Sequence, residues 1–542
     1  MYISSDDAVP NLNQIDANGR IVALPRGKQL GGSSAINFMF WTHASQRDID
    51  NWGNLGNLNW SWSALEPYYR KSESYVNPSA QTEQDLQTQY IQPSLHGTQG
   101  PIFNTFPDVY GPLDEAWPRA YQQLGLFVQS DPRDGLATGG YTNLISIDLE
   151  QHTRSYAATA YYQPASKRPN LSVVTGALVD KILFETEPGG EDVTALGVQY
   201  TYNEEVLEVF ANSEVLLCAG TFGSPQILEL SGVGDPELLS EYDIVTFVDN
   251  NAVGENLQDH AYVPIGYEVI PGVPTLDDLS DPTTFENAYN EYITNHTGPL
   301  ATTGASSALL SLGQITQAQD NISGICTDEV NNLGPGLTKQ YKLLLSGLAT
   351  EAVTQELTID GGMSPQFVND TTKLFHVSFP GNFFTLLGVL EHPFSRGSVH
   401  IQSANISDYP TIDPRYLSHP ADLKLLSIIA LHLQRIAATE PLSNLLKGNG
   451  TVYQPGYYEL DESNVEDWIR QNSQSEFHPA GTCAMMPKEL GGVVNERFKV
   501  YGTQNLRVVD ASIFPLLPRA NLQTLVYAIA ERAADFIKAD NL

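Results

Sequence analysis

Residues 26–37 read RGKQLGGSSAIN, and this stretch decides how the rest of the chain is interpreted. Two consecutive glycines followed by two serines let a backbone approach a ligand closely and point N–H groups and hydroxyls at anionic oxygens. GGSS alone is equally typical of an ordinary glycine turn. The longer pattern continues to Trp41, Ala44 and Asp50 and is far more specific. It favours a loop that contacts a ligand.

Two further motifs follow along the chain. GTFGSPQILELSGVG (220–234), with VGENLQDH (253–260), combines a glycine at a strand end with a proline at a helix start. This is typical of a tight strand–turn–helix beside a cofactor, and a plain βα unit is the alternative. FHPAGTCAMM (477–486) places His478 between an aromatic residue and a proline. A restricted loop of this kind positions a catalytic base, and a structural histidine is the alternative.

The hydrophobic pattern around these motifs predicts both strands and helices. We expect two short strands around Gly176 within 171–185, and further strands in 193–202, 204–211, 213–220 (a buried strand edge) and 505–512. We expect helices in three places: a short one after Pro225 that ends at Gly232, one over 421–437, and one over 524–539. The strand–helix junctions predict an α/β domain, and the mixed segment 261–472 predicts a separate α+β domain.

Composition limits the function classes. The chain has 542 residues, which favours two domains or an interleaved pair. It carries 28 Lys plus Arg against 63 Asp plus Glu, a formal charge of −35, which argues against nucleic-acid binding and against adhesion to anionic membranes. No apolar run is long enough to span a bilayer.

Cysteines and glycosylation signals bear on the compartment. Only Cys218, Cys326 and Cys483 occur, so at most one disulfide can form. Seven Asn-x-Ser/Thr sequons lead us to expect a secreted glycoprotein, with an intracellular protein as the open alternative. Residues 1–14 show neither the basic start nor the apolar stretch of a signal peptide, and we expect any such segment to have been lost with the N-terminus. The sequons are at Asn59, Asn170, Asn295, Asn321, Asn369, Asn405 and Asn449.

Together the three motifs resemble the glucose–methanol–choline (GMC) family of FAD-dependent oxidoreductases. The similarity continues through WGNLGNLNWSWSALEPYYRKSE (52–73), HPFSRGSVHI (392–401) and DYPTIDPRYLSHPADL (408–423), and so covers almost the whole chain. HPAGTCAMMPKELGGVV (478–494) is especially similar to fungal oxidases and dehydrogenases of the family. The resemblance implies a doubly wound, Rossmann-like FAD-binding domain (1–60, 154–260, 473–542) interleaved with a substrate domain on an antiparallel sheet (61–153, 261–472).

The resemblance also implies roles for single residues. His478 would be the base that takes the alcohol proton, and Asn521 would orient the hydroxyl. The residues implied to contact FAD are Gly31, Gly32, Ser33, Asn37, Val179, Asp510, Ala511, Asn521 and Leu522. Members with a covalent flavin link it through a histidine of the first motif. This chain has Ala35, Ile36 and Asn37 there, so we expect non-covalent FAD. Separately, we expect no metal.

One departure from the family concerns the N-terminus. The family opens with a G-x-G-x-x-G turn that cradles the pyrophosphate, and neither this pattern nor G-x-G-x-x-A occurs in the sequence. We therefore expect this dinucleotide-binding unit to be missing. The chain is then either part of a longer protein or a short form that binds FAD poorly or not at all.

The expected activity is oxidation of a primary or secondary alcohol, an aryl alcohol or a secondary metabolite rather than a free sugar, with dioxygen or a quinone as electron acceptor. Two alternatives stay open. One is a non-redox cyclase or dehydratase on the same fold, and the other is an inactive truncated form.

Overall fold

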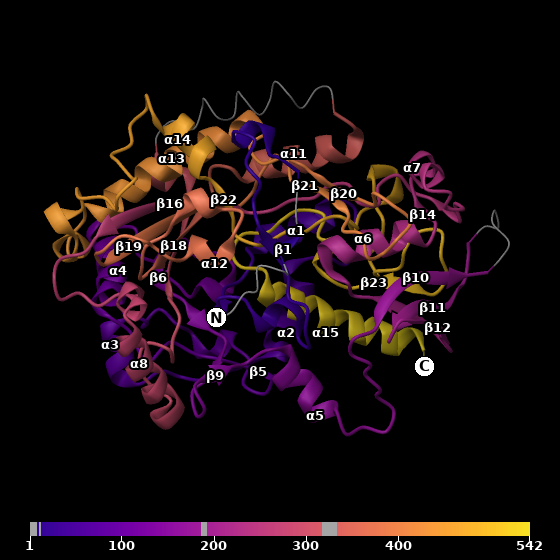
Figure 1. Cartoon of the computed structure of the whole chain (residues 1–542), viewed down its shortest axis with the longest axis horizontal. Coiled ribbons are helices and arrows are strands. Elements are labelled where there is room, and N and C mark those ends of the chain that lie inside the picture. The colour runs from indigo at the N-terminus through magenta and orange to yellow at the C-terminus, as the bar shows by residue number, and fades with distance from the viewer. Residues whose placement is uncertain (1–7, 10–11, 186–191, 317–332, 542) are drawn as a thin grey trace.

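The computed structural model describes residues 8–9, 12–185, 192–316 and 333–541. Asn321 and Cys326 lie outside the described residues, while Cys218 and Cys483 are free thiols. Figure 1 shows the orange strands of a large sheet toward one end of the molecule and β10 (Leu178–Phe184), β11 (Ala195–Tyr202) and β12 (Glu205–Phe210) toward the other. The C-terminal helix α15 (Gln523–Asp540) starts near the middle and ends close to β12.

The large sheet has six strands, and every neighbouring pair is antiparallel. Two of its strands come from sequence segments on either side of 261–472, so three parts of the chain meet in it. In spatial order the strands are β22 (Gln474–Ser475), β16 (Ala261–Glu268), β19 (Phe383–Leu390), β18 (Ala352–Ile359), β17 (Ser306–Ser311) and β6 (Gly139–Thr142).

Helices α4 (Pro112–Gln123) and α13 (Pro420–Ala437) both contact Glu356 of β18. The Glu356 carboxylate accepts the Tyr121 hydroxyl of α4 and lies 2.7 Å from His432 Nδ1 of α13. Both helices therefore cover the same face of the sheet. Side chains alternate along a strand, so the neighbouring Gln355 points to the opposite face, where the catalytic motif lies.

The α/β part is built on parallel strands β13 (Val215–Leu217) and β23 (Leu506–Val508), with β10 (Leu178–Phe184), β11 (Ala195–Tyr202) and β12 (Glu205–Phe210) forming an antiparallel sheet beside them. Helix α6 (Gly220–Leu230) follows β13 and packs on β10. The strands expected over 193–202, 204–211, 213–220 and 505–512 are confirmed. Helices α13 and α15 are confirmed too, the latter with Leu525, Ile529 and Ala533 buried.

Three local predictions are wrong. Residues 171–177 form no strand, because they are exposed and no described strand pairs with them. Leu216, expected on a buried strand, is 46% exposed. Helix α6 starts at Gly220 and runs through Pro225. Proline has no N–H to bond the carbonyl four residues earlier, and here the Thr482 hydroxyl donates to that carbonyl, on Thr221, at 2.6 Å.

Further helices and two-stranded pairs occur in the described residues. The remaining helices are α1 (Gln46–Asn54), α2 (Trp62–Ser72), α3 (Ala80–Asp85), α5 (Gln163–Ala165), α7 (Pro236–Glu241), α8 (Pro282–Asn295), α9 (Leu312–Ile315), α11 (Pro335–Gly347), α12 (Thr371–Leu374) and α14 (Val465–Asn472). Two-stranded pairs join β1 (Ala8–Val9) to β2 (Leu24–Pro25), β3 (Phe40–Trp41) to β7 (Leu144–Ile145), β4 (Glu73–Tyr75) to β5 (Ile102–Asn104), β8 (Ile147–Asp148) to β9 (Thr153–Arg154), β14 (Val233–Gly234) to β15 (Val248–Asp249), and β20 (Ser398–His400) to β21 (Thr411–Asp413).

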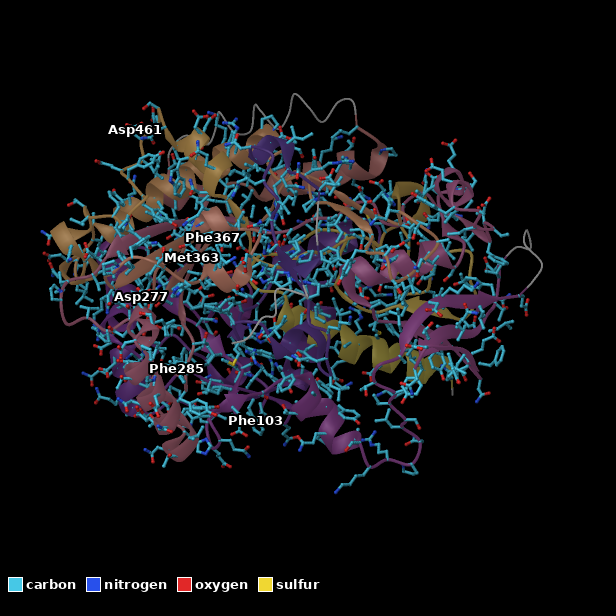
Figure 2. The ribbon with its side chains drawn as sticks, viewed as in Figure 1. Phe103, Asp277, Phe285, Met363, Phe367 and Asp461 are labelled. Carbon is cyan, nitrogen blue, oxygen red and sulfur yellow. The ribbon has the colours of Figure 1, made fainter. Side chains whose placement is uncertain are left out.

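Three features concern the surface: a loop held by Asp277, the sequon asparagines, and the hydropathy of the described helices. Figure 2 labels Asp277, whose carboxylate accepts the Gly362 amide at 3.1 Å and the Phe383 amide at 2.8 Å and so ties a surface loop to β19. All six sequon asparagines within the described ranges are exposed. Among the described helices, none combines the length and hydropathy needed to cross a bilayer.

Candidate active site

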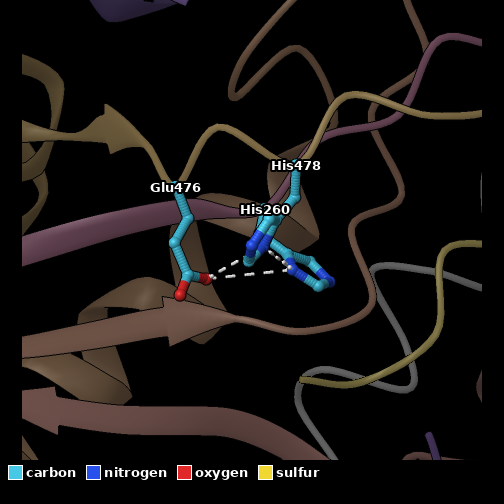
Figure 3. A group of neighbouring side chains, drawn as sticks. All are labelled: His260, Glu476 and His478. Atoms are coloured by element: carbon cyan, nitrogen blue, oxygen red, sulfur yellow. Dashed lines mark hydrogen bonds and ion pairs between the residues drawn. The ribbon is translucent and has the colours of Figure 1, made fainter. Parts of the chain in front are cut away.

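The site is organised by the pairing of β16 with β22. In this antiparallel pair Ala261 lies opposite Ser475, so His260 and Glu476 are the next residues beyond the two strands. The Glu476 amide donates to the His260 carbonyl at 2.9 Å. His478 follows two residues later, and Figure 3 shows its ring grouped with the His260 ring and the Glu476 carboxylate.

The two histidines are joined through their Nδ1 atoms, which lie 3.0 Å apart. His260 Nε2 lies 2.9 Å from the Glu391 carbonyl oxygen, which can only accept, so Nε2 carries the proton. Burial lowers the pKa of His260 well below its usual value and keeps this ring neutral. Its Nδ1 then holds a lone pair and accepts from Nδ1–H of His478. The chain of bonds leaves the lone pair of His478 on Nε2.

The backbone of the His478 turn is held by Asp259. Its carboxylate accepts the His478 amide at 2.9 Å and the Ser475 hydroxyl at 2.5 Å. Phe477 has a φ of 64°, in the left-handed region, and Arg26 Nη2 donates to its carbonyl at 2.6 Å. The first residue of the RGK motif thus braces the turn that presents His478.

Asn521 has its amide group oriented by three partners. Its Oδ1 accepts from Thr42 Oγ1 at 3.2 Å and from Gln355 Nε2 at 3.3 Å. The Nδ2 group therefore faces the other way, 3.0 Å from Glu476 Oε1 and 3.5 Å from His478 Nε2. Asn521 and His478 Nε2 thus border one point where a substrate hydroxyl can bind.

Glu391 closes the back of the site. Its carboxylate accepts the Ala520 amide, where the backbone φ is 71°. Burial raises the pKa of Glu391 well above its usual value, and the nearby Glu476 raises it further. Among the residues that the structure describes, none hydrogen-bonds to its other oxygen, Oε1. A protonated Glu391 avoids placing a second buried carboxylate charge beside the histidine pair.

The predicted flavin loop lies against the start of α15. Gly31 and Gly32 have φ values of 90° and 53° and lead into a single 3₁₀ turn (Gly32–Ala35) in which Ser33 is exposed. Asn37 is held by protein partners: Nδ2 donates to Gln523 Oε1 at 3.0 Å, and Oδ1 accepts from Arg154 Nη1 at 2.6 Å. The loop and the Asn521–Leu522 junction are therefore adjacent.

The second group of predicted flavin residues meets at the N-terminus of α6. Asp510 accepts the Gly220 amide at 2.9 Å and the Ser224 hydroxyl at 2.6 Å. The Ala511 carbonyl accepts the Gly481 amide at 3.2 Å, which connects this junction to the HPAGT turn. Val179 is separate from this junction, on the half-buried side of β10.

These two groups fit a ligand that lies along exposed backbone. A Cβ added at Gly32, Gly176 or Gly220 would meet no atom within 4 Å, so the chain is open at each of these glycines. All three have positive φ, which glycine adopts at little cost. Gly31 to Ser33, Asp510 and Ala511 would thus lie along FAD, with His478 and Asn521 near its reactive ring.

Some residues of the site were not predicted as such. His260 and Glu476 lie within or directly beside quoted motifs, so their neighbourhood was signalled but their roles were not. Thr42 and Gln355 gave no signal, because only the packing of distant segments brings them to Asn521. Asp259 and Glu391 likewise act through contacts that span more than a hundred residues of sequence.

Comparison with known proteins agrees with this arrangement. The family models described as GMC oxidoreductase match residues 9–262 and 393–530. The N-terminal match begins at residue 9, so it gives no support to the expected absence of the dinucleotide-binding unit, which stays a prediction.

Similar proteins cover nearly all of the chain. The GMC oxidoreductase family protein Mala s 12 of Malassezia sympodialis is 35% identical over 536 residues, 97% of this chain and 81% of the relative. Dehydrogenase citC of Monascus ruber is 34% identical over 559 residues, with 98% and 86% covered.

Two solved structures are similar as well. An FAD-dependent oxidoreductase from Chaetomium thermophilum has a TM-score of 0.87 at 28% identity, covering 99% of this chain and 91% of the other. A structure described as a new fungal aryl-alcohol oxidase has a TM-score of 0.83 at 25% identity, covering 98% and 89%. FAD is thus the cofactor of this fold, and the chain belongs to the GMC oxidoreductase family.

Proposed function

We propose that the chain oxidises an alcohol to an aldehyde or ketone, with His478 as the base. The observation that carries this proposal is the hydrogen-bond chain from the Glu391 carbonyl through His260 to His478. It supports a His478 tautomer with the proton on Nδ1 and the lone pair on Nε2, which Asn521 Nδ2 faces at 3.5 Å. A neutral imidazole in this state is suited to take a hydroxyl proton near neutral pH.

The reaction transfers two hydrogens in different forms. His478 Nε2 takes the hydroxyl proton, and the developing alkoxide favours departure of the hydrogen on the carbinol carbon as hydride. FAD, when bound, supplies the acceptor for that hydride. The C–H electron pair leaves with the hydride, while the O–H electrons form the second carbon–oxygen bond of the product.

Asn521 and Glu476 assist without taking the proton. The Asn521 amide, fixed by Thr42 and Gln355, donates Nδ2–H toward the substrate oxygen and keeps the hydroxyl in line with His478. Once His478 is protonated, Glu476 Oε2, 3.4 Å from its Nδ1, stabilises the imidazolium. The base is therefore flanked by a group that orients the substrate and a group that offsets charge.

We further propose an aryl alcohol or a secondary metabolite as substrate and a non-covalent flavin. The similar structure described as an aryl-alcohol oxidase supports an aryl alcohol, and the relatives named dehydrogenases support an oxidation without naming its substrate. Positions 35–37 offer no histidine for a covalent link, and the side chain of Asn37 is already engaged by Gln523 and Arg154.

Substitution of the base tests the proposed reaction. We expect His478→Ala to slow flavin reduction by an aryl alcohol by at least about 100-fold, since general bases contribute roughly 10²–10⁴-fold, while the flavin stays bound. Stopped-flow absorbance of the flavin band measures this rate. His376→Ala, at an exposed histidine on the surface, is the matched control and should reduce normally. Near-normal reduction in the His478 variant would rule out the assignment.

A further inference from the structure

The three side chains that surround His478 Nδ1 form a donor set of their own. His260 Nδ1, His478 Nδ1 and Glu476 Oε2 face one another across the start of the HPAGT turn (Figure 3). Their separations are 3.0 Å between the two nitrogens, 3.4 Å from His478 to Glu476, and 3.8 Å from His260 to Glu476. We call this set the His–Glu–His triangle.

The size of the triangle matches one metal ion. Zinc binds imidazole nitrogen and carboxylate oxygen at about 2.0–2.2 Å in a tetrahedral arrangement, which places neighbouring ligand atoms about 3.3–3.5 Å apart. The three distances between donor atoms, 3.0, 3.4 and 3.8 Å, have a mean within this range, and each lies within a few tenths of an ångström of it. Small ring rotations would therefore bring all three atoms into one coordination sphere.

The electronic state of the donors also suits an ion. His260 Nδ1 already holds a lone pair, because Nε2–H is committed to the Glu391 carbonyl, as is common for metal-bound histidine. The Glu476 side chain is 10% exposed, and no residue of the described part of the chain hydrogen-bonds to its buried Oε2 atom. Glu476 Oε1 is held by Asn521 Nδ2, which aims Oε2 into the triangle.

We propose that the His–Glu–His triangle binds a single divalent transition-metal ion of the Zn²⁺ class, and that the ion inhibits the enzyme by capturing the catalytic histidine. Binding requires His478 Nδ1 to release its proton to solvent and donate its lone pair to the metal. A neutral imidazole keeps one N–H, so the remaining proton then sits on Nε2. His478 presents a donor to the substrate and cannot take the hydroxyl proton.

The same three groups thus have two incompatible uses. In the proposed catalysis His478 Nδ1 bears a hydrogen that faces two acceptors, His260 Nδ1 and Glu476 Oε2. In the metal-bound form the ion takes the place of that hydrogen. Soft or borderline ions with affinity for imidazole should bind, whereas Mg²⁺ and Ca²⁺, which favour sets of oxygen ligands, should not.

Calorimetric titration of the chelator-treated, flavin-containing enzyme with ZnCl₂ tests the site. We expect one ion per chain, no binding of MgCl₂, and loss of flavin reduction in step with zinc occupancy that EDTA reverses. Glu476→Gln and His260→Gln should each weaken zinc binding by more than the 10–100-fold typical of outer-shell partners, because each removes a direct ligand. Flavin absorbance and far-UV circular dichroism confirm that the variants are folded.

A surface histidine provides the matched control. His400 has a carboxylate at each ring nitrogen, Glu229 at 2.7 Å from Nδ1 and Glu255 at 3.1 Å from Nε2, but the two carboxylates do not converge on one point. His400→Gln should leave stoichiometry and affinity unchanged. The inference is overturned if zinc does not bind, or if His400→Gln removes the binding that Glu476→Gln and His260→Gln retain. The inhibition rests on the proposed function, whereas calorimetry needs no turnover. Zinc binding by a protein that oxidises no alcohol would therefore contradict the proposed function and the inhibition, and the zinc site itself would stand.

Discussion

At the scale of single residues, direction matters more than proximity. His478 is bounded by three polar groups, and each has one permitted role: His260 accepts at Nδ1, Glu476 accepts beside it, and Asn521 donates near Nε2. At one end the Glu391 carbonyl oxygen fixes the direction of the His260 bonds. At the other end Thr42 and Gln355 both donate to Asn521 Oδ1, which fixes the direction of the Asn521 amide. In the proposed reaction the proton therefore enters the imidazole at Nε2, the nitrogen that faces Asn521.

Asn521→Ala tests the orienting role. The substitution removes one hydrogen bond to the substrate and leaves the base in place, so we expect flavin reduction to slow by roughly 10–100-fold, less than for His478→Ala. Single-turnover reduction at saturating alcohol measures the effect. Gln355→Ala should produce a smaller loss in the same direction, since Gln355 reaches the proposed substrate position through Asn521. A loss for Asn521→Ala equal to that of His478→Ala contradicts the division of roles.

At the scale of elements, the register of β16 with β22 brings the site residues together. The motifs that carry these residues could be predicted from the sequence, but the pairing of the two strands could not. The motifs around His260 and His478 could be read from the sequence, because glycines and prolines there restrict the backbone locally. Their contact could not, since two-residue β22 carries no periodic signal and pairs across more than two hundred residues. The contact of Gln355 with Asn521 could not be predicted either, since the two residues are 166 positions apart in the sequence.

Two buried aspartates near α4 and β18 have raised pKa values, so the folded state disfavours their charged forms. Asp114 of α4 has a pKa raised by burial to about 6, and Asp360, after β18, has one raised well above its usual value by burial and by Asp114. Asp360 Oδ1 has no hydrogen-bond partner. The folded chain therefore binds more protons here than the unfolded chain above pH 3.8, the ordinary value for aspartate.

This gives a pH prediction with a definite sign. The stabilisation from protonated Asp114 is fully present below the unfolded pKa and is lost as pH rises through about 6. Stability should fall by about 1.4 kcal/mol per pH unit for each extra proton bound by the fold. Asp114→Asn keeps an acceptor for the Gly111 amide and removes the titration, so its unfolding free energy should depend less on pH between 4 and 7.

Denaturant unfolding at a series of pH values measures that slope. Asp467→Asn is the control, because this side chain is 85% exposed and should leave the slope unchanged. A slope that is the same in wild type and in Asp114→Asn would show that the buried pair does not titrate in this range.

At the scale of the whole molecule, the proposed active site exists only because distant segments converge. The loop 26–37 and the start of α15 form one wall, the junction of β23 with α6 forms another, and β18 supplies Gln355 from the opposite sheet. Each wall is tied to the HPAGT turn by hydrogen bonds, through Arg26 on one side and Ala511 on the other. Flavin binding therefore reports on the assembly of the whole fold.

The purified 542-residue chain should carry FAD, visible as an oxidised flavin spectrum that bleaches when an aryl alcohol is added anaerobically. Acid precipitation should release the flavin into the supernatant, because no histidine is available at positions 35–37 for a covalent link. His478→Ala protein should show the same spectrum without bleaching, which separates binding from chemistry. A chain without flavin would mean that the converging segments do not suffice to hold FAD, whereas a bound flavin that no alcohol bleaches would favour the non-redox reaction on this fold.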